Sequence, residues 1–354
     1  MKAARWHGRG DVRIDDIADP TPGVGELLLR IAWCGICGTD MEEYVAGPTL
    51  VPVDVPNGLT GRTAPLTLGH EFVGRVASVG EGVSGFDIGD RVAPEVVLFC
   101  RECFFCRHHQ YALCEQWAAL GLHTDGGLAE YAVVPAFSCA HLPDTLSDEE
   151  GALVEPTEVA VRAVGKSGTR LGDSVAVVGG GTIGLLALQV ARAAGAGETY
   201  LIEPLAPRRE LGLTLGASAV FDPQQSEWET QLRSACGGIG PDVVLECAGG
   251  RDTAETAVRV ARKGATIVLV GIHPERVPFS TLEVIVGEKH VVGSVQHHYD
   301  EDLPAALRLL AAGQVRVAPL ITDRIPLERV VPDGLRALAE HPRDHLKILV
   351  SPKA

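Results

Sequence analysis

The sequence predicts an α/β protein with two domains, a mostly β domain followed by a doubly wound parallel sheet. At 354 residues the chain exceeds the size at which one hydrophobic core usually suffices. Short β-type runs broken by glycine and proline fill its first part, whereas strands alternate with helices in its second part. The fold class is predicted from these three observations: the chain length, the β-type runs and the alternation of strands with helices.

The mostly β domain is expected over residues 1–155 and again over the tail, residues 295–354. Apolar runs such as 27–32 and 72–77 lie between glycine- and proline-rich turns, as strands do. Residues 45–65 contain many prolines and glycines and no periodicity, so a long loop over the site is expected there. In the tail, the pattern predicts a helix at 303–312 and a last strand at 346–350.

The doubly wound domain is expected over residues 156–294. Its predicted strands alternate with helical segments such as 185–194, and they lie at 174–178, 199–203, 243–246 and 266–270. Alternation of this kind is typical of a parallel sheet with helices on both faces.

Composition excludes several classes of function. The formal net charge of −15 argues against a broad surface for nucleic acid and favours small-molecule partners. The first eight residues lack an apolar run after their positive charge, and no later stretch approaches the roughly 20 apolar residues of a membrane span. A cytoplasmic protein without a membrane partner is therefore expected.

A glycine loop joins the strand at 174–178 to the helix that follows. The loop reads Gly-Gly-Gly-Thr-Ile-Gly, and its candidate cofactor-binding residues are Gly179, Gly181, Thr182, Ile183 and Gly184. Glycines at these places allow a tight turn, a close approach of backbone amides to a pyrophosphate, and close packing of the helix. An ordinary strand-to-helix turn is the alternative, since glycine is common in this chain.

Glu203 favours the cofactor interpretation because it closes the next predicted strand, 19 residues after Gly184. An acidic side chain there accepts hydrogen bonds from the adenosine ribose and repels the 2′-phosphate of NADP. NAD is therefore the expected cofactor. Arg208 and Arg209 keep NADP as an alternative, although their ordinary role is on a solvated helix face.

Four of the nine cysteines form a compact group with two, two and seven residues between successive members: Cys100, Cys103, Cys106 and Cys114. Four thiolates complete a tetrahedron around Zn²⁺ and leave no open position, as in structural zinc sites. An iron–sulfur cluster is the alternative, but Glu115 follows the last cysteine where the bacterial ferredoxin pattern has proline.

A second set of metal ligands is predicted from Cys37, His70 and Glu155. One sulfur, one nitrogen and one oxygen donor leave a fourth position for water or substrate, as catalytic zinc requires. Each residue alone has a structural explanation, as a core cysteine, a hydrogen-bonded histidine or a glutamate at a helix start. Asp40 is the expected hydrogen-bonding partner of a ligand, by the usual pairing of carboxylate with histidine.

With these motifs, the chain resembles a zinc-containing medium-chain dehydrogenase over nearly its whole length. The resemblance is closest to the (R,R)-2,3-butanediol and sorbitol dehydrogenase branch, on residues 35–40 (GICGTD), 68–72 (LGHEF) and 151–156 (GALVEP). It implies a GroES-like first domain, a Rossmann second domain, two zinc ions per subunit, and reversible hydride transfer from a secondary alcohol to NAD in a homodimer or homotetramer.

Residue by residue, the resemblance makes Cys37, His70 and Glu155 the ligands of the catalytic zinc. It makes Glu71 a carboxylate that lies behind the metal or ligates it, and Thr39 the hydroxyl that takes the alcohol proton. Glu42 stands where the family usually has a proton-relay histidine, so proton release through a carboxylate or through water is expected.

Several functions remain open at this point. Butanediol, acetoin, a sugar polyol, an amino alcohol and an aminocyclitol are all candidate substrates. A zinc-free reductase of the same fold is disfavoured because it has no use for Cys37, His70 and Glu155 together. A non-catalytic NAD- and zinc-binding redox sensor is the alternative from another class.

Overall fold

The computed structural model describes residues 1–273 and 275–353, so Ala354 of the expected first domain lies outside the description. The chain divides into two compact units. The first comprises Met1–Glu155, His297–Leu307 and Leu320–Ala354, and the second comprises Pro156–Gln296 and Arg308–Pro319. The sequence had assigned the whole tail from residue 295 to the first domain, whereas the contacts group Arg308–Pro319 with the second unit.

The first unit is built mainly from strands. They are β1 (Lys2–Gly8), β2 (Asp11–Asp16), β3 (Glu26–Gly35), β4 (Leu66–Thr67), β5 (Glu71–Val79), β6 (Arg91–Pro94), β7 (Val97–Leu98), β8 (Ala118–Ala119), β9 (Tyr131–Pro135), β10 (Cys139–His141), β17 (Ile321–Pro326) and β18 (Lys347–Ser351). The largest sheet has the order β10-β6-β5-β3-β18-β17, with β9 also paired to β3. Smaller sheets are β2-β1-β4 and β7-β8.

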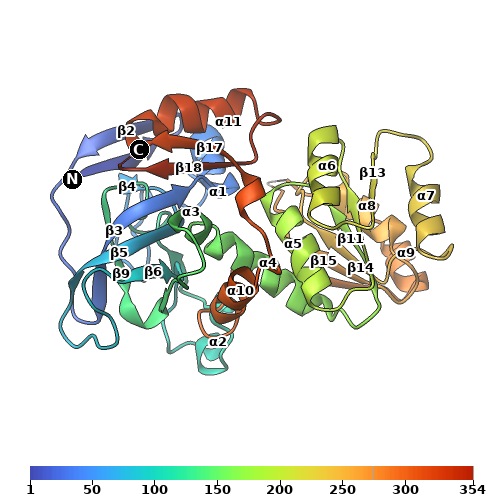
Figure 1. Cartoon of the computed structure of the whole chain (residues 1–354), viewed down its shortest axis with the longest axis horizontal. Coiled ribbons are helices and arrows are strands. Elements are labelled where there is room, and N and C mark those ends of the chain that lie inside the picture. The colour runs from blue at the N-terminus through green and yellow to red at the C-terminus, as the bar shows by residue number, and fades with distance from the viewer. Residues whose placement is uncertain (274, 354) are drawn as a thin grey trace. The chain divides into compact units, whose positions relative to one another are not determined.

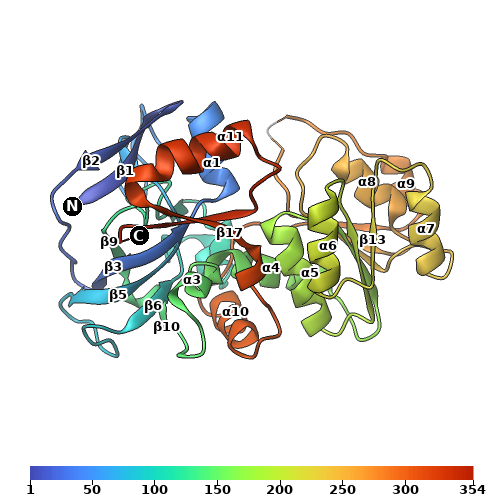
Figure 2. The same cartoon turned by 45° about the horizontal axis from the view of Figure 1, so that its top comes forward.

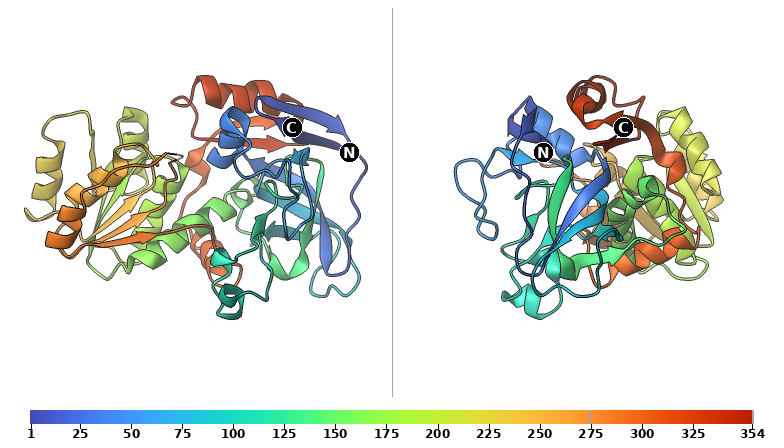
Figure 3. Two further views of the ribbon diagram at one scale, coloured as in Figure 1. Left: turned by 180° about the vertical axis from the view of Figure 1, so that it is seen from behind. Right: turned by 60° about the vertical axis from the view of Figure 1, so that its left-hand side comes forward.

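The C-terminal strand completes the large sheet of this unit. β18 pairs antiparallel with β3 and parallel with β17, and Figure 3 shows these three strands side by side. Alternate residues of β3 are buried, including Leu27, Leu29 and Ile31, because successive side chains of a strand point to opposite faces. These side chains join the hydrophobic core of the unit. The predicted return of the tail to the first domain therefore holds for its last strand.

Helices of the first unit are short and lie at its turns. They are α1 (Gly38–Ala46), α2 (Phe104–Arg107), α3 (Asp148–Gly151) and α11 (Arg336–Glu340). Short segments of tighter or wider helix occupy Tyr111–Leu113, Ala136–Ser138, Leu327–Arg329 and Val330–Leu335, and another, Ala318–Leu320, begins in the second unit and ends in the first. Two further helices, α4 (Val154–Ser167) and α10 (Asp302–Ala311), continue along the chain from one unit into the other.

The second unit is a six-stranded parallel sheet with the order β13-β12-β11-β14-β15-β16. Its strands are β11 (Ser174–Val178), β12 (Glu198–Ile202), β13 (Ala219–Phe221), β14 (Val243–Glu246), β15 (Thr266–Leu269) and β16 (His290–Gly293). In order along the chain this is the arrangement 3-2-1-4-5-6 of a dinucleotide-binding sheet. The strand order reverses between β11 and β14, and the carboxyl ends of these strands flank the place where such sheets bind ligands.

Helices cover both faces of this sheet. They are α5 (Thr182–Ala193), α6 (Ala206–Thr214), α7 (Trp228–Ala235), α8 (Thr253–Val260) and α9 (Thr281–Val286). Figures 1 and 2 show α5 and α6 on one face, with α8 and α9 on the other. Residues 184–191 of α5 are all buried, so the helix is covered on every side, and part of its surface packs on β11 and β12.

The sequence pattern did not predict two strands of this sheet. β13 has only three residues, and the residues of the edge strand β16 are exposed or half-buried. Neither segment is a long apolar run, which is the pattern by which a buried parallel strand is recognised. Within the described residues, no helix is both long and apolar enough to span a membrane.

Candidate active site

Cys37 lies between β3 and α1, immediately before the first residue of the helix. The backbone N–H of Cys37 donates to Oδ2 of Asp40 at 2.9 Å, which satisfies one of the unpaired donors at the helix start. The thiol is half-buried, and its Sγ lies 3.9 Å from the hydroxyl of Thr39. The helix start therefore fixes Cys37 and Thr39 side by side.

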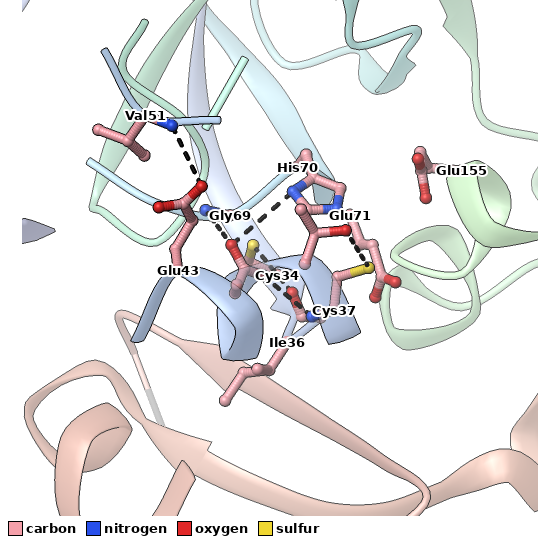
Figure 4. Close-up of polar contacts among 12 residues, drawn as sticks. Cys34, Ile36, Cys37, Glu43, Val51, Gly69, His70, Glu71 and Glu155 are labelled. Atoms are coloured by element: carbon pink, nitrogen blue, oxygen red, sulfur yellow. Dashed lines mark hydrogen bonds and ion pairs between the residues drawn. The ribbon is translucent and has the colours of Figure 1, made fainter. Parts of the chain in front are cut away.

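His70 lies next to Cys37, as Figure 4 shows. Gly69 precedes it with a φ of +92°, and a side chain there would meet the Sγ of Cys34 at 2.7 Å, so only glycine fits. The same Asp40 accepts the N–H of Gly69 at 3.3 Å through Oδ1, and this oxygen lies 3.8 Å from His70 Nδ1. The buried Asp40 thus joins the segments that carry Cys37 and His70.

Charge around His70 outweighs the effect of its burial. Burial alone lowers the pKa of the imidazole, but the negative charges of Cys37, Asp40 and Glu155 raise it well above its usual value. A positively charged group bound near this imidazole would meet the same anionic surroundings. The site is therefore electrostatically suited to a cation.

Glu71 follows His70 and forms a buried ion pair with Lys347 of β18. Lys347 is 3% exposed and Glu71 is 1% exposed, and the ammonium also donates to the carbonyl of Ile36 at 3.0 Å. Burial raises the pKa of Glu71, and Lys347 partly opposes that rise. The carboxylate of Glu71, which was predicted to lie behind the metal, is therefore paired with Lys347. The sequence did not identify this lysine as a residue of the site.

Glu155, at the start of α4, is held by His297. Its Oε1 lies 2.9 Å from His297 Nε2, while Nδ1 of the same ring lies 2.7 Å from Oε2 of Glu95. Burial alone raises the pKa of Glu155, but the hydrogen bond and charge of His297 overcome it, so the pKa is lowered. Glu155 is therefore held in its anionic form, the form that binds a metal ion.

The three predicted ligands all belong to the first unit, and Figure 4 shows Glu155 apart from the adjacent Cys37 and His70. Among the described residues, Cys37, His70 and Glu155 do not form a group with all ligand atoms within 4.8 Å of one another. The donor set nevertheless fits zinc, because a thiolate, an imidazole and an anionic carboxylate leave one coordination position for a small molecule.

Glu42 and Glu43 occupy different environments on α1. Glu42 is exposed, and partial burial together with the charge of Glu43 raises the pKa of its carboxyl. Glu43 is fully buried, and its carboxylate accepts the N–H groups of Thr49, Leu50 and Val51 and the hydroxyl of Thr49. Glu43 therefore anchors the segment that follows α1, while Glu42 faces solvent.

The expected loop after α1 contains neither helix nor strand from Gly47 to Pro65. A second connection fixes it, since the hydroxyl of Thr60 donates to the carbonyl of His123 at 2.6 Å. The loop is thus attached within the first unit through Glu43 and Thr60, and also through Arg5, which donates to the carbonyl of Pro65.

The four clustered cysteines come together around α2. Their Sγ atoms all lie within 4.8 Å of one another, with Cys100 to Cys106 at 3.9 Å and Cys103 to Cys114 at 4.0 Å. Four sulfurs bound to zinc at about 2.3 Å in a tetrahedron are roughly 3.8 Å apart. The cluster therefore has the dimensions of a four-thiolate zinc site.

Backbone amides also surround these sulfurs. The N–H groups of Cys103, Cys106 and Gln116 point at the sulfurs of Cys100, Cys103 and Cys114, at 3.3, 3.5 and 3.4 Å. Donation from Cys106 is the largest cause that lowers the pKa of Cys103 to about 6. At Cys103 the backbone thus stabilises the thiolate, the form in which cysteine binds zinc, whereas burial raises the pKa of Cys106 and of Cys114.

The glycine loop of the second unit has the expected course from β11 into α5. Gly179 adopts a φ of +101°, and a Cβ on Gly184 would lie 1.8 Å from the carbonyl oxygen of Gly179. The loop and the first turn of α5 therefore touch, as the glycine pattern requires. Gly181 is the residue before α5, and Thr182 and Ile183 form its first turn.

Glu203 follows β12 and reaches back to this loop. Its Oε2 accepts the N–H of Gly180 at 2.6 Å, and its Oε1 accepts the N–H of Leu205 at 2.8 Å. Arg209 donates to the carbonyl of Glu203 at 2.7 Å and pairs with Asp222 at 3.2 Å. The acidic residue is thus fixed beside the loop, while Arg209 is engaged elsewhere and Arg208 is half-buried on α6.

Two family models match the chain. Residues 23–144 match the alcohol dehydrogenase GroES-like domain, and residues 182–312 match the zinc-binding dehydrogenase domain. The (R,R)-butanediol dehydrogenase of Bacillus subtilis (strain 168) is 38% identical over 99% of this chain and 100% of its own length. The chain belongs to the zinc-dependent medium-chain dehydrogenase family. A sorbitol dehydrogenase of Halalkalibacterium halodurans is 33% identical to this dehydrogenase over 89% of both chains.

Solved structures agree with this membership. The crystal structure of 2R,3R-butanediol dehydrogenase from Bacillus subtilis superposes with a TM-score of 0.91 at 38% identity, covering 99% of each chain. A zinc-binding dehydrogenase from Sinorhizobium meliloti bound to NADP has a TM-score of 0.89 at 33% identity, and an Escherichia coli dehydrogenase with NADH has 0.89 at 27%, each covering 99% of both chains. The dehydrogenase therefore shares the fold of nicotinamide-dependent enzymes.

Three residues around the site were not predicted from the sequence: Glu95, His297 and Lys347. Lys347 left a readable signal, since it interrupts the apolar strand at 346–350 with a charge. A charge inside a buried strand needs a partner, and Glu71 provides it. Glu95 and His297 left no comparable signal because 202 residues separate them along the chain.

Proposed function

We propose that this dehydrogenase transfers hydride reversibly from a secondary alcohol, in a vicinal diol or polyol, to NAD. The observation that supports the proposal is that Asp40 accepts hydrogen bonds from the segments of both Cys37 and His70 and so holds these two residues side by side. The anionic Glu155 lies in the same unit. The names of the butanediol and sorbitol dehydrogenases support the substrate class. A diol such as 2,3-butanediol, with its ketone acetoin, is the first substrate pair to test.

Two zinc ions per subunit are part of the proposal. The catalytic ion would be held by Cys37, His70 and Glu155, with Glu71 behind it, and the structural ion by Cys100, Cys103, Cys106 and Cys114. A zinc ion at the first site makes an alcohol more acidic by stabilising its alkoxide.

The chain itself must orient the substrate and move its proton. Thr39 Oγ1, half-buried beside Cys37, accepts the proton of the substrate hydroxyl and passes it on. Glu42, three residues further along α1, is exposed to solvent, and partial burial together with Glu43 raises the pKa of its carboxyl, so this carboxylate is the proposed group that receives the proton. Lys347 keeps Glu71 in place and balances its charge.

The nicotinamide cofactor of the proposal is NAD. The amides of the glycine loop and the start of α5 face the pyrophosphate, with Gly179, Gly181, Thr182, Ile183 and Gly184 as binding residues. The ribose hydroxyls bind the carboxylate of Glu203, which lies at the loop already. Arg208 remains the residue through which NADP would be tolerated.

Small-molecule alcohols and ketones are the proposed partners, together with further copies of the chain in a cytoplasmic homodimer or homotetramer. β16 is an edge strand, and the adjacent α9 exposes Leu282, Ile285 and Val286 at 69%, 72% and 63%. An edge strand beside apolar side chains is a surface that proteins usually cover. This supports self-association through the second unit.

The direct test is NADH absorbance with purified enzyme across vicinal diols, sugar polyols and amino alcohols, with NADP as the control cofactor. The proposal predicts the highest kcat/KM for a secondary alcohol of a vicinal diol or polyol, and a preference for NAD. Turnover of amino alcohols alone would move the substrate class to that alternative. No NADH with any alcohol, from enzyme that contains zinc, would favour the redox sensor and contradict the proposal.

A further inference from the structure

Three arginines lie in a row across the large sheet of the first unit. Arg30 of β3 is directly opposite Arg75 of β5, and Arg75 is directly opposite Arg91 of β6. Residues that face each other in this way on neighbouring strands point to the same side of the sheet, with their Cβ atoms roughly 5 Å apart. Like charges at such positions destabilise a sheet, so the row needs negative charge beside it.

One carboxylate serves one half of this row. Asp148, the first residue of α3, lies 2.7 Å from Nε of Arg91 and 3.4 Å from Nη2 of Arg75. Because α3 packs against β3 and β5, it keeps the carboxylate at this face of the sheet. Arg91 also donates to two backbone carbonyls, and its side chain is only 17% exposed. The fold therefore already places one anion between two neighbouring arginines.

The other half of the row, between Arg30 and Arg75, has no such carboxylate. Within the described residues, the side chain of Arg30 forms no ion pair or hydrogen bond, and Arg75 has only its long contact with the aspartate of α3 as an ion pair. The glutamates of α3 are engaged elsewhere. Glu149 pairs with Arg324 of β17 at 2.7 Å, and Glu150 accepts the N–H and the hydroxyl of the residue that caps α3.

A cavity of about 260 Å³ lies at this half of the row. Its described lining contains three cationic side chains, Arg30, Arg75 and Lys353, and one carboxylate, that of the aspartate of α3. The lining thus carries two positive charges in excess, in a chain whose formal net charge is −15. Residues 31–33 add a mainly apolar wall. Sites for drug-sized ligands measure roughly 300–1,000 Å³, so this cavity suits a compact ligand.

We propose that this cavity binds a phosphate dianion, free or as the monoester of a small metabolite, between the guanidinium groups of Arg30 and Arg75. A dianion balances the two excess charges of the lining, and the planar guanidinium fork matches the oxygens of a phosphate group. Lys353 adds a third cationic donor. None of these residues belongs to the proposed metal or cofactor sites, so the inference goes beyond the proposed function and does not depend on it.

Isothermal titration calorimetry of the zinc-loaded enzyme with inorganic phosphate tests the proposal. NADH at saturation keeps phosphate away from the glycine loop, and chloride at equal ionic strength gives the background of general screening. We expect saturable binding of one phosphate per chain. In Arg30→Gln the Kd for phosphate should rise roughly tenfold or more, because hydrogen bonds between two charged groups are lost.

Arg30→Gln should fold like the parent enzyme, because no described group loses a bond with it. Its Tm in phosphate-free buffer should equal or exceed the parental Tm, since one pair of opposed charges is removed. Phosphate should then raise the Tm of the parent more than the Tm of the variant. A lower Tm in phosphate-free buffer would contradict the repulsion on which the inference rests.

Arg336→Gln is the matched control. Arg336 is the first residue of α11 in the same unit, is exposed, and does not line the cavity. This variant removes the same charge and should keep the parental Kd for phosphate. Equal losses in Arg30→Gln and Arg336→Gln would indicate a general effect of charge and would overturn the inference.

A second titration, with glycerol 3-phosphate, identifies the source of the phosphate group. Tighter binding than that of inorganic phosphate, weakened in Arg30→Gln, indicates a phosphorylated metabolite, whereas equal or weaker binding indicates free phosphate. Parental affinity for both ligands in Arg30→Gln would show that they bind elsewhere. That result, or the absence of saturable binding to the parent enzyme, would overturn the proposal.

Discussion

Single residues of the candidate site were predictable where their chemistry is local. Cys37, His70 and Glu203 lie in short motifs whose spacing along the chain indicates their neighbours. Asp40 was predicted as a partner of a ligand, and its carboxylate does bind the segments of both Cys37 and His70. His297 was not predictable, because its contact with Glu155 joins residues 142 positions apart and depends on how the whole unit folds.

Glu203 carries a prediction about cofactor choice at this scale. Glu203→Gln removes the negative charge but keeps the shape of the side chain beside Gly180. A lost hydrogen bond to a charged group costs about 1.5–3 kcal/mol, so the Kd of NAD should rise roughly tenfold or more. The preference for NAD over NADP should shrink, because the variant no longer repels the 2′-phosphate.

Fluorescence titration with NADH and NADPH measures both effects. Arg208→Gln is the companion variant, and it should weaken NADPH binding to the Glu203→Gln enzyme if Arg208 faces the 2′-phosphate. An unchanged ratio of the two affinities in Glu203→Gln would contradict the assigned role of the carboxylate.

Among secondary-structure elements, long apolar segments were predicted well and short edge elements poorly. The predicted strands 174–178 and 243–246 coincide with β11 and β14. The helix predicted at 185–194 begins three residues earlier, at Thr182, because the turn after the glycine loop is already helical. β16 has exposed or half-buried residues, so no apolar run marked it, although it completes the sheet.

The cysteine lobe gives a prediction about stability. Cys103→Ser removes one of four sulfurs that lie within 4.8 Å of one another and should release the structural zinc. Loss of a bound metal is one of the mechanisms behind large destabilisation by single substitutions, so we expect the free energy of unfolding to fall by about 3 kcal/mol and the Tm by roughly 5 °C or more. The chemistry of the folded fraction should change much less than its stability.

Differential scanning fluorimetry and zinc analysis test this, with Cys236→Ser as the control, since Cys236 lies in the second unit outside the cluster. The variant should contain one zinc per chain less than its parent. Equal melting temperatures for Cys103→Ser and the parent enzyme would argue against a structural metal in the lobe.

For the whole molecule, the order of elements along the chain was enough to predict the fold class. A mostly β unit is followed by a parallel sheet in the order β13-β12-β11-β14-β15-β16, and family models match both parts. The assignment of the C-terminal tail to a unit was less predictable. Arg308–Pro319 belongs to the second unit, and the chain then returns to the first unit with β17 and β18. Such a crossing depends on packing of the finished sheets, for which a one-dimensional pattern holds no information.

The central claim is that Cys37 holds a metal that performs the chemistry while a separate unit binds the cofactor. Cys37→Ser tests it most directly, with kcat and NADH affinity measured on the same preparation and with Cys139→Ser as the control for loss of a sulfur in the first unit. Metal stabilisation of an alkoxide supplies several kcal/mol, so kcat should fall roughly a thousandfold or more. NADH should still bind with its parental Kd. Parental turnover in Cys37→Ser would contradict the account.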